Sequence, residues 1–313
     1  MKWQGFGILA VVGVLWAGCT GGPYSRNELR ELRRYESPPV EARSKYVEIR
    51  GKKIHFLDQG DGPAILLLHG FPTSSYTWRH VMRLLAPRYH VYAIDLVGYG
   101  KSKVEPDVGR GLGEQVSYVA EWMDAIGLET AIVVGQDLGG GVAQLLAVKY
   151  PQKVRGMVLV NSVCFDSWPY QYANLLSEPG YGPFVGEGVA RPNGFYGMMM
   201  QGVYYQKLLS KGVMSYYYEP WEGVQGRRDL IRAAQDQNHQ DTLAIAPRLG
   251  EIRAPVLVIA GQFDPFQPTN YSRRLAAAIP GAQFHMIPNC GHFASEDEPE
   301  KIVKLIVDFF GYR

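Results

Sequence analysis

The chain of 313 residues is long enough for two domains, or for one large α/β domain with an insertion. Its composition of 46% hydrophobic and 20% charged residues, with a net charge of +2, excludes a disordered protein and a polybasic nucleic-acid binder. It predicts a globular protein without a nucleic-acid partner. The three cysteines, Cys19, Cys164 and Cys290, form no CxxC or Cys/His pattern, so no disulfide framework or zinc site is expected. No motif implies a metal or an organic cofactor.

Residues 1–22 are predicted to be an export signal. No charge occurs between Lys2 and Arg26, and the apolar run Phe6–Ala17 is followed by small residues of the kind at which signal peptides are cut. Twelve residues of helix span only about 18 Å, against ~30 Å of bilayer hydrocarbon, so the run is short for a permanent span. An uncleaved membrane anchor and a plain apolar leader are the alternatives.

The end of this segment resembles a bacterial lipoprotein box. Residues 15–19 read Leu-Trp-Ala-Gly-Cys, in which the cysteine would become the lipidated first residue of the mature chain. Trp16 departs from the box, which usually has a smaller aliphatic residue there. The resemblance implies an exported lipoprotein attached to a membrane through Cys19. Residues 23–43 mix arginine with glutamate and contain a Pro-Pro pair, and we predict that they form a tether.

From residue 44 onward the pattern is typical of an α/β protein. Continuous apolar runs, typical of strands buried on both faces, alternate with helical patterns. This predicts a mostly parallel sheet flanked by helices over residues 44–164 and 250–313. The expected elements are strands at 46–50, 53–57 and 64–68, a helix at 75–85, a strand at 91–94, a helix at 112–126, a strand at 131–134, a helix at 138–150, strands at 157–160 and 255–259, and helices at 271–279 and 298–310.

The alternation stops between residues 165 and 249. This stretch holds most of the tyrosines, the run Met198–Met200 and no strong strand pattern. We predict an inserted helical cap, because insertions after a parallel strand emerge at the end of the sheet where ligands bind. The alternative is an ordinary helical domain that contacts no site.

A sharp turn within residues 131–141 carries an aspartate, Asp137, between a predicted strand and a predicted helix. This is the G-x-Nu-x-G arrangement of a nucleophile elbow, with aspartate where serine hydrolases have serine. The glycines let strand and helix pass closely, and the helix dipole favours an anion at this place. Asp137 is therefore the predicted nucleophile. The alternative is that it only caps the helix.

Three other segments supply partners in the chain order that such sites use. The loop His69–Pro72 predicts that the backbone N–H groups of Phe71 and Leu138 converge on one oxyanion. Asp264 follows a later buried strand, and His292 lies in the loop before the last helix. Each of these residues also has an ordinary structural explanation as a turn former or a buried polar group. Their joint order of nucleophile, acid and histidine favours a catalytic site.

From about residue 46 the chain resembles the α/β-hydrolase superfamily. An aspartate at the elbow points to its haloalkane dehalogenase and epoxide hydrolase branches. The segments 69–79, 95–102 and 217–221 are similar to haloalkane dehalogenase sequences.

The resemblance implies a two-step reaction on a small apolar substrate. Asp137 would displace a leaving group from carbon and form an alkyl ester, which water activated by His292 would hydrolyse. Asp264 would orient His292, and the N–H groups of Phe71 and Leu138 would stabilise the oxyanion.

The residues that would hold a departing halide are missing from their usual positions. Dehalogenases of this branch usually place tryptophan directly after the nucleophile and another donor after His-Gly. Leu138 and Phe71 stand there, and neither side chain donates a hydrogen bond. Trp168 and Trp221 in the predicted cap are candidates for the missing indole N–H, although most cap tryptophans serve packing.

Two features favour an epoxide hydrolase instead. The loop His-Gly-Phe-Pro is frequent in those enzymes, which use two cap tyrosines as acids on the epoxide oxygen. Residues 172–180 resemble the stretch that carries the first of them, at Tyr172. Ile231 stands near the position of the second, and Tyr217 is the candidate substitute, although burial is the commoner role of such a tyrosine.

We therefore predict an exported α/β-hydrolase with a helical cap, whose partners are a small apolar substrate and water. A haloalkane dehalogenase-like reaction is favoured, and an epoxide hydrolase is the alternative. A non-catalytic, ligand-sensing lipoprotein of the same fold is a further alternative, but Asp137, Asp264 and His292 are all present and argue against it. A serine esterase would need another nucleophile, since Ser102 and Ser162 lie outside the elbow.

Overall fold

The computed structural model describes residues 42–105, 107–169 and 182–311. The predicted export signal, the lipidation site Cys19, the predicted tether up to residue 41 and the candidate Tyr172 lie outside these residues. In the described part of the chain, no helix is long and apolar enough to cross a membrane.

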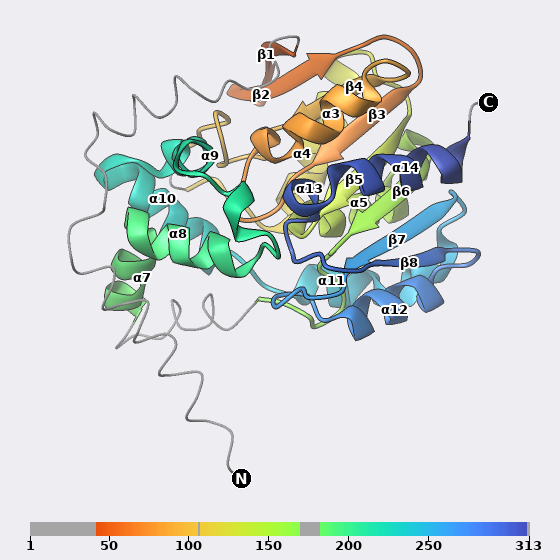
Figure 1. Ribbon diagram of the computed structural model, residues 1–313. Coiled ribbons are helices and arrows are strands. Elements are labelled where there is room, and N and C mark those ends of the chain that lie inside the picture. The colour runs from red at the N-terminus through yellow and green to blue at the C-terminus, as the bar shows by residue number, and fades with distance from the viewer. Residues whose placement is uncertain (1–41, 106, 170–181, 312–313) are drawn as a thin grey trace.

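An eight-stranded sheet in the order β1-β2-β4-β3-β5-β6-β7-β8 forms the centre of the molecule (Figure 1). β2 pairs antiparallel with β1 and with β4, and all other neighbouring strands are parallel. The predicted mostly parallel sheet is thereby confirmed. The strands are β1 Arg43–Ile49, β2 Lys52–Gln59, β3 Ala64–Leu68, β4 His90–Ile94, β5 Ala131–Gln136, β6 Val154–Val160, β7 Val256–Gly261 and β8 Gln283–Ile287.

Helices cover both faces of this sheet, which is why its central strands are apolar throughout. In β3, Leu66 and Leu68 join the core cluster that includes residues of α4, α5 and α12, whereas Ile65 and Leu67 join the cluster under α3 and α14. The helices and helical turns of these layers are η1 Ser75–Trp78, α3 Arg79–Leu85, α4 Leu112–Ala125, α5 Leu138–Lys149, η2 Pro151–Lys153, α12 Thr269–Ala278, α13 Ala294–Asp297 and α14 Pro299–Phe310.

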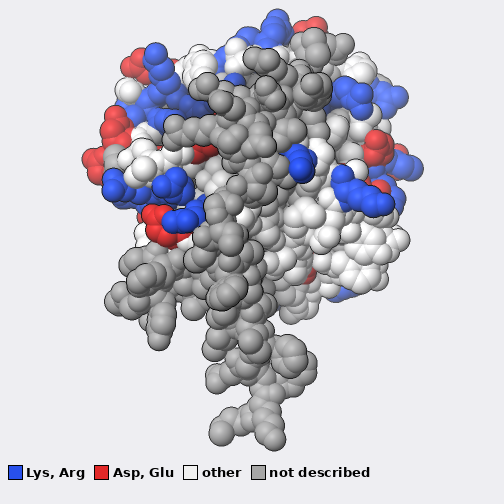
Figure 2. All heavy atoms as spheres, turned by 60° about the vertical axis from the view of Figure 1, so that its left-hand side comes forward, with Lys and Arg blue, Asp and Glu red and all other residues white. Residues whose placement is uncertain are grey.

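Between β6 and β7 the described chain contains helices and no strand. Helices α7 to α10 gather at one end of the sheet in Figure 1, and α11 returns the chain to contact α5. The elements are α7 Gly182–Ala190, α8 Pro192–Gln201, η3 Gln206–Leu208, α9 Lys211–Tyr218, η4 Glu219–Trp221, α10 Gly223–Gln235, α11 Gln240–Ile245 and η5 Ala246–Glu251. On the face seen in Figure 2, basic and acidic side chains are interspersed.

The structure extends the sequence prediction at both edges of the sheet. β1 begins at Arg43, three residues before the predicted strand, and its first four residues are exposed. β8 was not predicted. Its residues alternate between exposed and partly buried up to Ile287, because an edge strand packs on one face only, so it lacks the continuous apolar run of the central strands.

Candidate active site

The elbow forms as expected, with Asp137 between the end of β5 and the start of α5. Its backbone has φ 52° and ψ −119°, a strained conformation for a residue other than glycine. A Cβ on Gly135 would lie 2.3 Å from the carbonyl oxygen of Gly139, and one on Gly139 would lie 2.2 Å from that of Leu68. Only glycines let the strand and the helix approach so closely, and this approach holds Asp137 at the top of the turn.

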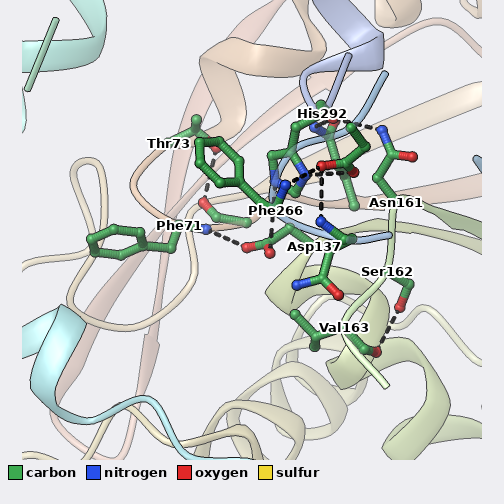
Figure 3. A network of polar contacts seen from close by, with 12 residues as sticks. Phe71, Thr73, Asp137, Asn161, Ser162, Val163, Phe266 and His292 are labelled. Atoms are coloured by element: carbon green, nitrogen blue, oxygen red, sulfur yellow. Dashed lines mark hydrogen bonds and ion pairs between the residues drawn. The ribbon is translucent and has the colours of Figure 1, made fainter. Parts of the chain in front are cut away.

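Two backbone N–H groups meet the carboxylate of Asp137. Phe71 donates from its backbone N to Oδ1 at 2.9 Å (Figure 3). The backbone N–H of Leu138 also hydrogen-bonds the carboxylate and lowers its pKa. The loop can come so near because Gly70 has no side chain, since a Cβ there would lie 2.4 Å from Oδ1. The structure thus brings together Phe71 and Leu138, the two predicted oxyanion donors.

His292 lies between the two carboxylates. Its Nδ1 hydrogen-bonds Oδ2 of Asp264 at 2.9 Å, and its Nε2 is 3.7 Å from Oδ2 of Asp137. The other oxygen of Asp264 accepts from the backbone N of Phe266 at 2.7 Å and of Gln267 at 2.9 Å. Because a carboxylate only accepts, Asp264 fixes the proton of His292 on Nδ1 and leaves Nε2 free to accept one.

Burial and charge act against each other on this pair. Burial opposes protonation of His292, but the nearby carboxylates of Asp264 and Asp137 outweigh it, and the pKa of His292 lies above its ordinary value. Burial raises the pKa of Asp137, while His292 and the N–H groups of Leu138 and Phe71 work in the opposite direction. His292 is thus well placed to hold a proton taken from water.

The pH dependence of ester hydrolysis should report the titration of His292. Only the neutral imidazole takes a proton from water, so the rate rises with pH to a midpoint at the pKa of His292, which the charge of Asp264 raises. In Asp264→Asn that support is lost, so the midpoint should fall and the rate should drop. Single-turnover hydrolysis of the pre-formed ester measures both.

Asp166→Asn is the matched control for this profile, because Asp166 is half exposed and pairs with Arg274 at 3.5 Å, away from the histidine. A midpoint below 6.5 that is the same in wild type, Asp264→Asn and Asp166→Asn would contradict the assignment of His292 as base.

Asn161 ties the loops of the site together, although no sequence motif pointed to it. Its Nδ2 donates to the carbonyl oxygens of Gly291 at 2.9 Å and His292 at 2.8 Å, and its Oδ1 accepts from the backbone N of Gly261 at 2.7 Å. Gln136 also donates to the carbonyl oxygen of His292. The sequence feature that could have pointed to Asn161 is its position as a polar residue directly after the buried strand β6.

A pocket between the sheet domain and the helices after β6 contains both Asp137 and His292. Its described lining is mainly apolar, which suits a small apolar substrate. Helices α7, α8 and α10 contribute the apolar side chains Val189, Ala190, Met198, Leu230, Ile231 and Ala234.

The two candidate tryptophans donate their indole N–H groups elsewhere. Trp168 lines the pocket, but its Nε1 donates to Oγ1 of Thr242 at 2.8 Å. Trp221 is fully buried, and its Nε1 donates to the carbonyl oxygen of Pro72 at 3.0 Å. In this structure neither indole N–H is free to hold a halide, because each already has a partner.

Tyr217 is also engaged away from the pocket. Its hydroxyl donates to Glu296, which pairs with Arg79, and its ring packs edge-on against Tyr76. It is fully buried and is absent from the described pocket lining, and burial holds its pKa well above the ordinary value. In this structure Tyr217 is therefore not placed to act as the substitute acid. Ile231, near the position expected for that acid, does line the pocket.

His69 has a structural role. Its Nδ1 hydrogen-bonds the carbonyl oxygen of Gly70 at 3.0 Å, and its Nε2 accepts from the backbone N of Leu96 at 3.0 Å. Both ring nitrogens are used and burial lowers its pKa, so it is no second base. Among the described residues, no group of three or more His, Cys, Asp and Glu side chains could hold a metal ion.

A nucleophile elbow over a mostly parallel sheet, with a histidine and an acid from later loops, defines a class of hydrolases. The chain belongs to the alpha/beta hydrolase fold family, whose model matches residues 63–299. It is a hydrolase of this fold.

The relatives cover most of the chain but differ in substrate. The chain is 28% identical to haloalkane dehalogenase 2 of Mycobacterium tuberculosis, over 86% of this chain and 95% of that protein. It is 31% identical to 2-hydroxy-6-oxononadienedioate/2-hydroxy-6-oxononatrienedioate hydrolase of Cupriavidus pinatubonensis, over 83% of this chain and 91% of that protein. The structure of epoxide hydrolase CorEH is similar with a TM-score of 0.76 at 22% identity, over 86% of this chain and 99% of that one, which shows the fold alone.

Proposed function

We propose that the protein hydrolyses small apolar haloalkanes through a covalent ester on Asp137. The observation that supports this most strongly is the placement of the two oxygens of Asp137. Oδ1 is held by the backbone N–H of Phe71, and Oδ2 faces Nε2 of His292 across 3.7 Å at the pocket.

In the first half-reaction, Oδ2 of Asp137 attacks the carbon that carries the halogen. A carbon–oxygen bond forms as the carbon–halogen bond breaks, and the halide leaves with the bonding electron pair. A serine hydroxyl would first have to lose a proton, whereas a carboxylate already carries its charge.

In the second half-reaction, Nε2 of His292 takes a proton from water, and the hydroxide attacks the ester carbonyl carbon. The negative charge that develops on Oδ1 of Asp137 is stabilised by the N–H groups of Phe71 and Leu138. Phe71 already donates to Oδ1, and Leu138 already hydrogen-bonds the carboxylate. The acyl–oxygen bond then breaks, and the alcohol leaves with the proton from His292. The carboxylic acid left on Asp137 releases its proton to solvent, which restores the carboxylate.

An epoxide hydrolase is the second candidate, supported by the loop His69–Pro72 and by the resemblance around Tyr172. An epoxide oxygen leaves as an alkoxide and needs an acid to protonate it, whereas a halide is stable without a proton. The described pocket lining includes no tyrosine, and the hydroxyl of Tyr217 is bound to Glu296. This favours the halide.

Serine is not positioned to replace Asp137. Oγ of Ser102 accepts from the backbone N of His55, and Oγ of Ser162 donates to the carbonyl oxygen of Val163. Neither serine belongs to the described lining of the pocket.

Trapping the ester tests the proposal. In His292→Gln the first half-reaction should proceed and the second should stop. After a haloalkane panel, the intact mass should show one halogen-free alkyl group, and peptide mass spectrometry should place it on the peptide with Asp137. The exposed His285→Gln on β8 is the matched control and should retain turnover without adduct.

The adduct also separates the candidates. A hydroxyalkyl group from an epoxide panel, with none from haloalkanes, would support the second candidate. No adduct from either panel, in protein that melts like the wild type, would contradict the covalent ester.

A further inference from the structure

The proposed function leaves one chemical requirement unmet, and this inference rests on that function. A departing halide gathers negative charge in a mainly apolar pocket and needs a hydrogen-bond donor there. The side chains of Phe71 and Leu138 cannot donate, and the N–H groups of Trp168 and Trp221 have partners.

Gln237 is a polar residue that lines the pocket just after the end of α10. Leu230, Ile231 and Ala234 line the pocket at helical spacing, and Gln237 comes three residues after the last of them. Its backbone N donates to the carbonyl oxygen of Ala234 at 3.3 Å, which ties it to the last turn of the helix. Gln237 itself lines the pocket that contains Asp137.

The amide nitrogen of Gln237 is buried and has no hydrogen-bond partner among the described residues. A buried donor without an acceptor costs free energy. A ligand that accepts a hydrogen bond removes this cost. Gln267 also lines the pocket, but its buried unpaired atom is the carbonyl oxygen Oε1, which would repel an anion.

We propose that the side-chain amide of Gln237 donates the hydrogen bond that holds the leaving halide. The amide N–H is a neutral donor that does not give up its proton. It suits a halide, which is stable as an anion, and it cannot protonate an alkoxide. Gln237 would thereby direct the site towards haloalkanes rather than epoxides.

Bromide binding tests this without turnover. Titration calorimetry with sodium bromide should show that Gln237→Leu, which keeps the bulk of the side chain but removes its donor, binds bromide about tenfold to a hundredfold more weakly than the wild type. Gln240→Leu is the matched control, because Gln240 is exposed and is not part of the described lining. Equal affinities in all three proteins, or no bromide binding by the wild type, would overturn the proposal.

The alkylation rate separates this inference from the proposed function. In the His292→Gln background, Gln237→Leu should slow adduct formation from haloalkanes about tenfold or more, whereas Gln240→Leu should not. An adduct that forms at an unchanged rate would overturn the role of Gln237 and leave the aspartyl ester standing. If no haloalkane gives an adduct, the proposed function fails, and the bromide titration alone decides for or against Gln237. The melting temperature of Gln237→Leu should not fall, since the change removes a buried unpaired donor.

Discussion

Alanine in place of Asp137 is expected to lower kcat for haloalkane hydrolysis by at least about 10⁴-fold. Without the carboxylate no ester forms, and neither His292 nor the N–H groups of Phe71 and Leu138 can replace a nucleophile. The loss of kcat is measured on the best substrate of the haloalkane panel with a pH indicator, which follows the proton released with each halide.

This variant should stay folded. Burial raises the pKa of Asp137, so the ionised carboxylate is poorly solvated and its removal relieves that cost. Alanine is strained at φ 52°, so Asp137→Asn, whose residue type tolerates positive φ better, is the second variant, and both should melt within a few degrees of the wild type. A kcat within tenfold of wild type in folded Asp137→Ala protein would contradict the nucleophile assignment.

Methionine in place of Arg79 is expected to lower the free energy of unfolding by about 3–5 kcal/mol. Arg79 at the start of α3 and Glu296 in α13 form a bidentate pair, with Nη1–Oε1 at 2.5 Å and Nη2–Oε2 at 2.8 Å. Their side chains are only 7% and 1% exposed, so the variant would leave the carboxylate buried without its cation. Tyr217 from α9 also donates to Glu296, which links the segment after β6 to the core.

Urea unfolding of a double-mutant cycle separates the pair from the loss of either side chain. Arg79→Met with Glu296→Leu should recover much of the loss, because no unpaired charge remains buried. Arg248→Met is the control at the surface, where the pair with Glu251 is half exposed on both sides and should contribute no more than about 1 kcal/mol. A loss below about 1 kcal/mol in Arg79→Met would contradict the buried-pair account.

The parts of the fold that could be predicted are those with a local physical signature. Strands such as β3 are covered on both faces, so they read as continuous apolar runs, and α5 follows a glycine-rich turn whose spacing is set by backbone contact. The same turn chemistry pointed to Asp137. The order in which Asp264 and His292 follow it supplied the remaining partners.

The parts that could not be predicted depend on packing between distant segments. Trp168, Trp221 and Tyr217 were candidates because of their side-chain chemistry. The side-chain hydrogen bonds of these three residues join positions at least 74 apart. The unpaired amide of Gln237 is likewise visible only in three dimensions, since a glutamine near the end of a helix has no sequence signature. The strand β8 could not be predicted because its residues alternate in exposure and so form no continuous apolar run.

The source of the oxygen in the first turnover tests the central claim most directly. Wild-type protein, in excess over a haloalkane, is allowed one turnover in ¹⁸O-labelled water. The masses of the alcohol and of the peptides of the protein are then measured by mass spectrometry. If Asp137 forms the ester, the alcohol carries unlabelled oxygen from its carboxylate, and the peptide with Asp137 gains one ¹⁸O from the water that cleaves the ester. Labelled alcohol together with an unlabelled Asp137 peptide would show that water attacks the substrate itself, and would contradict the account.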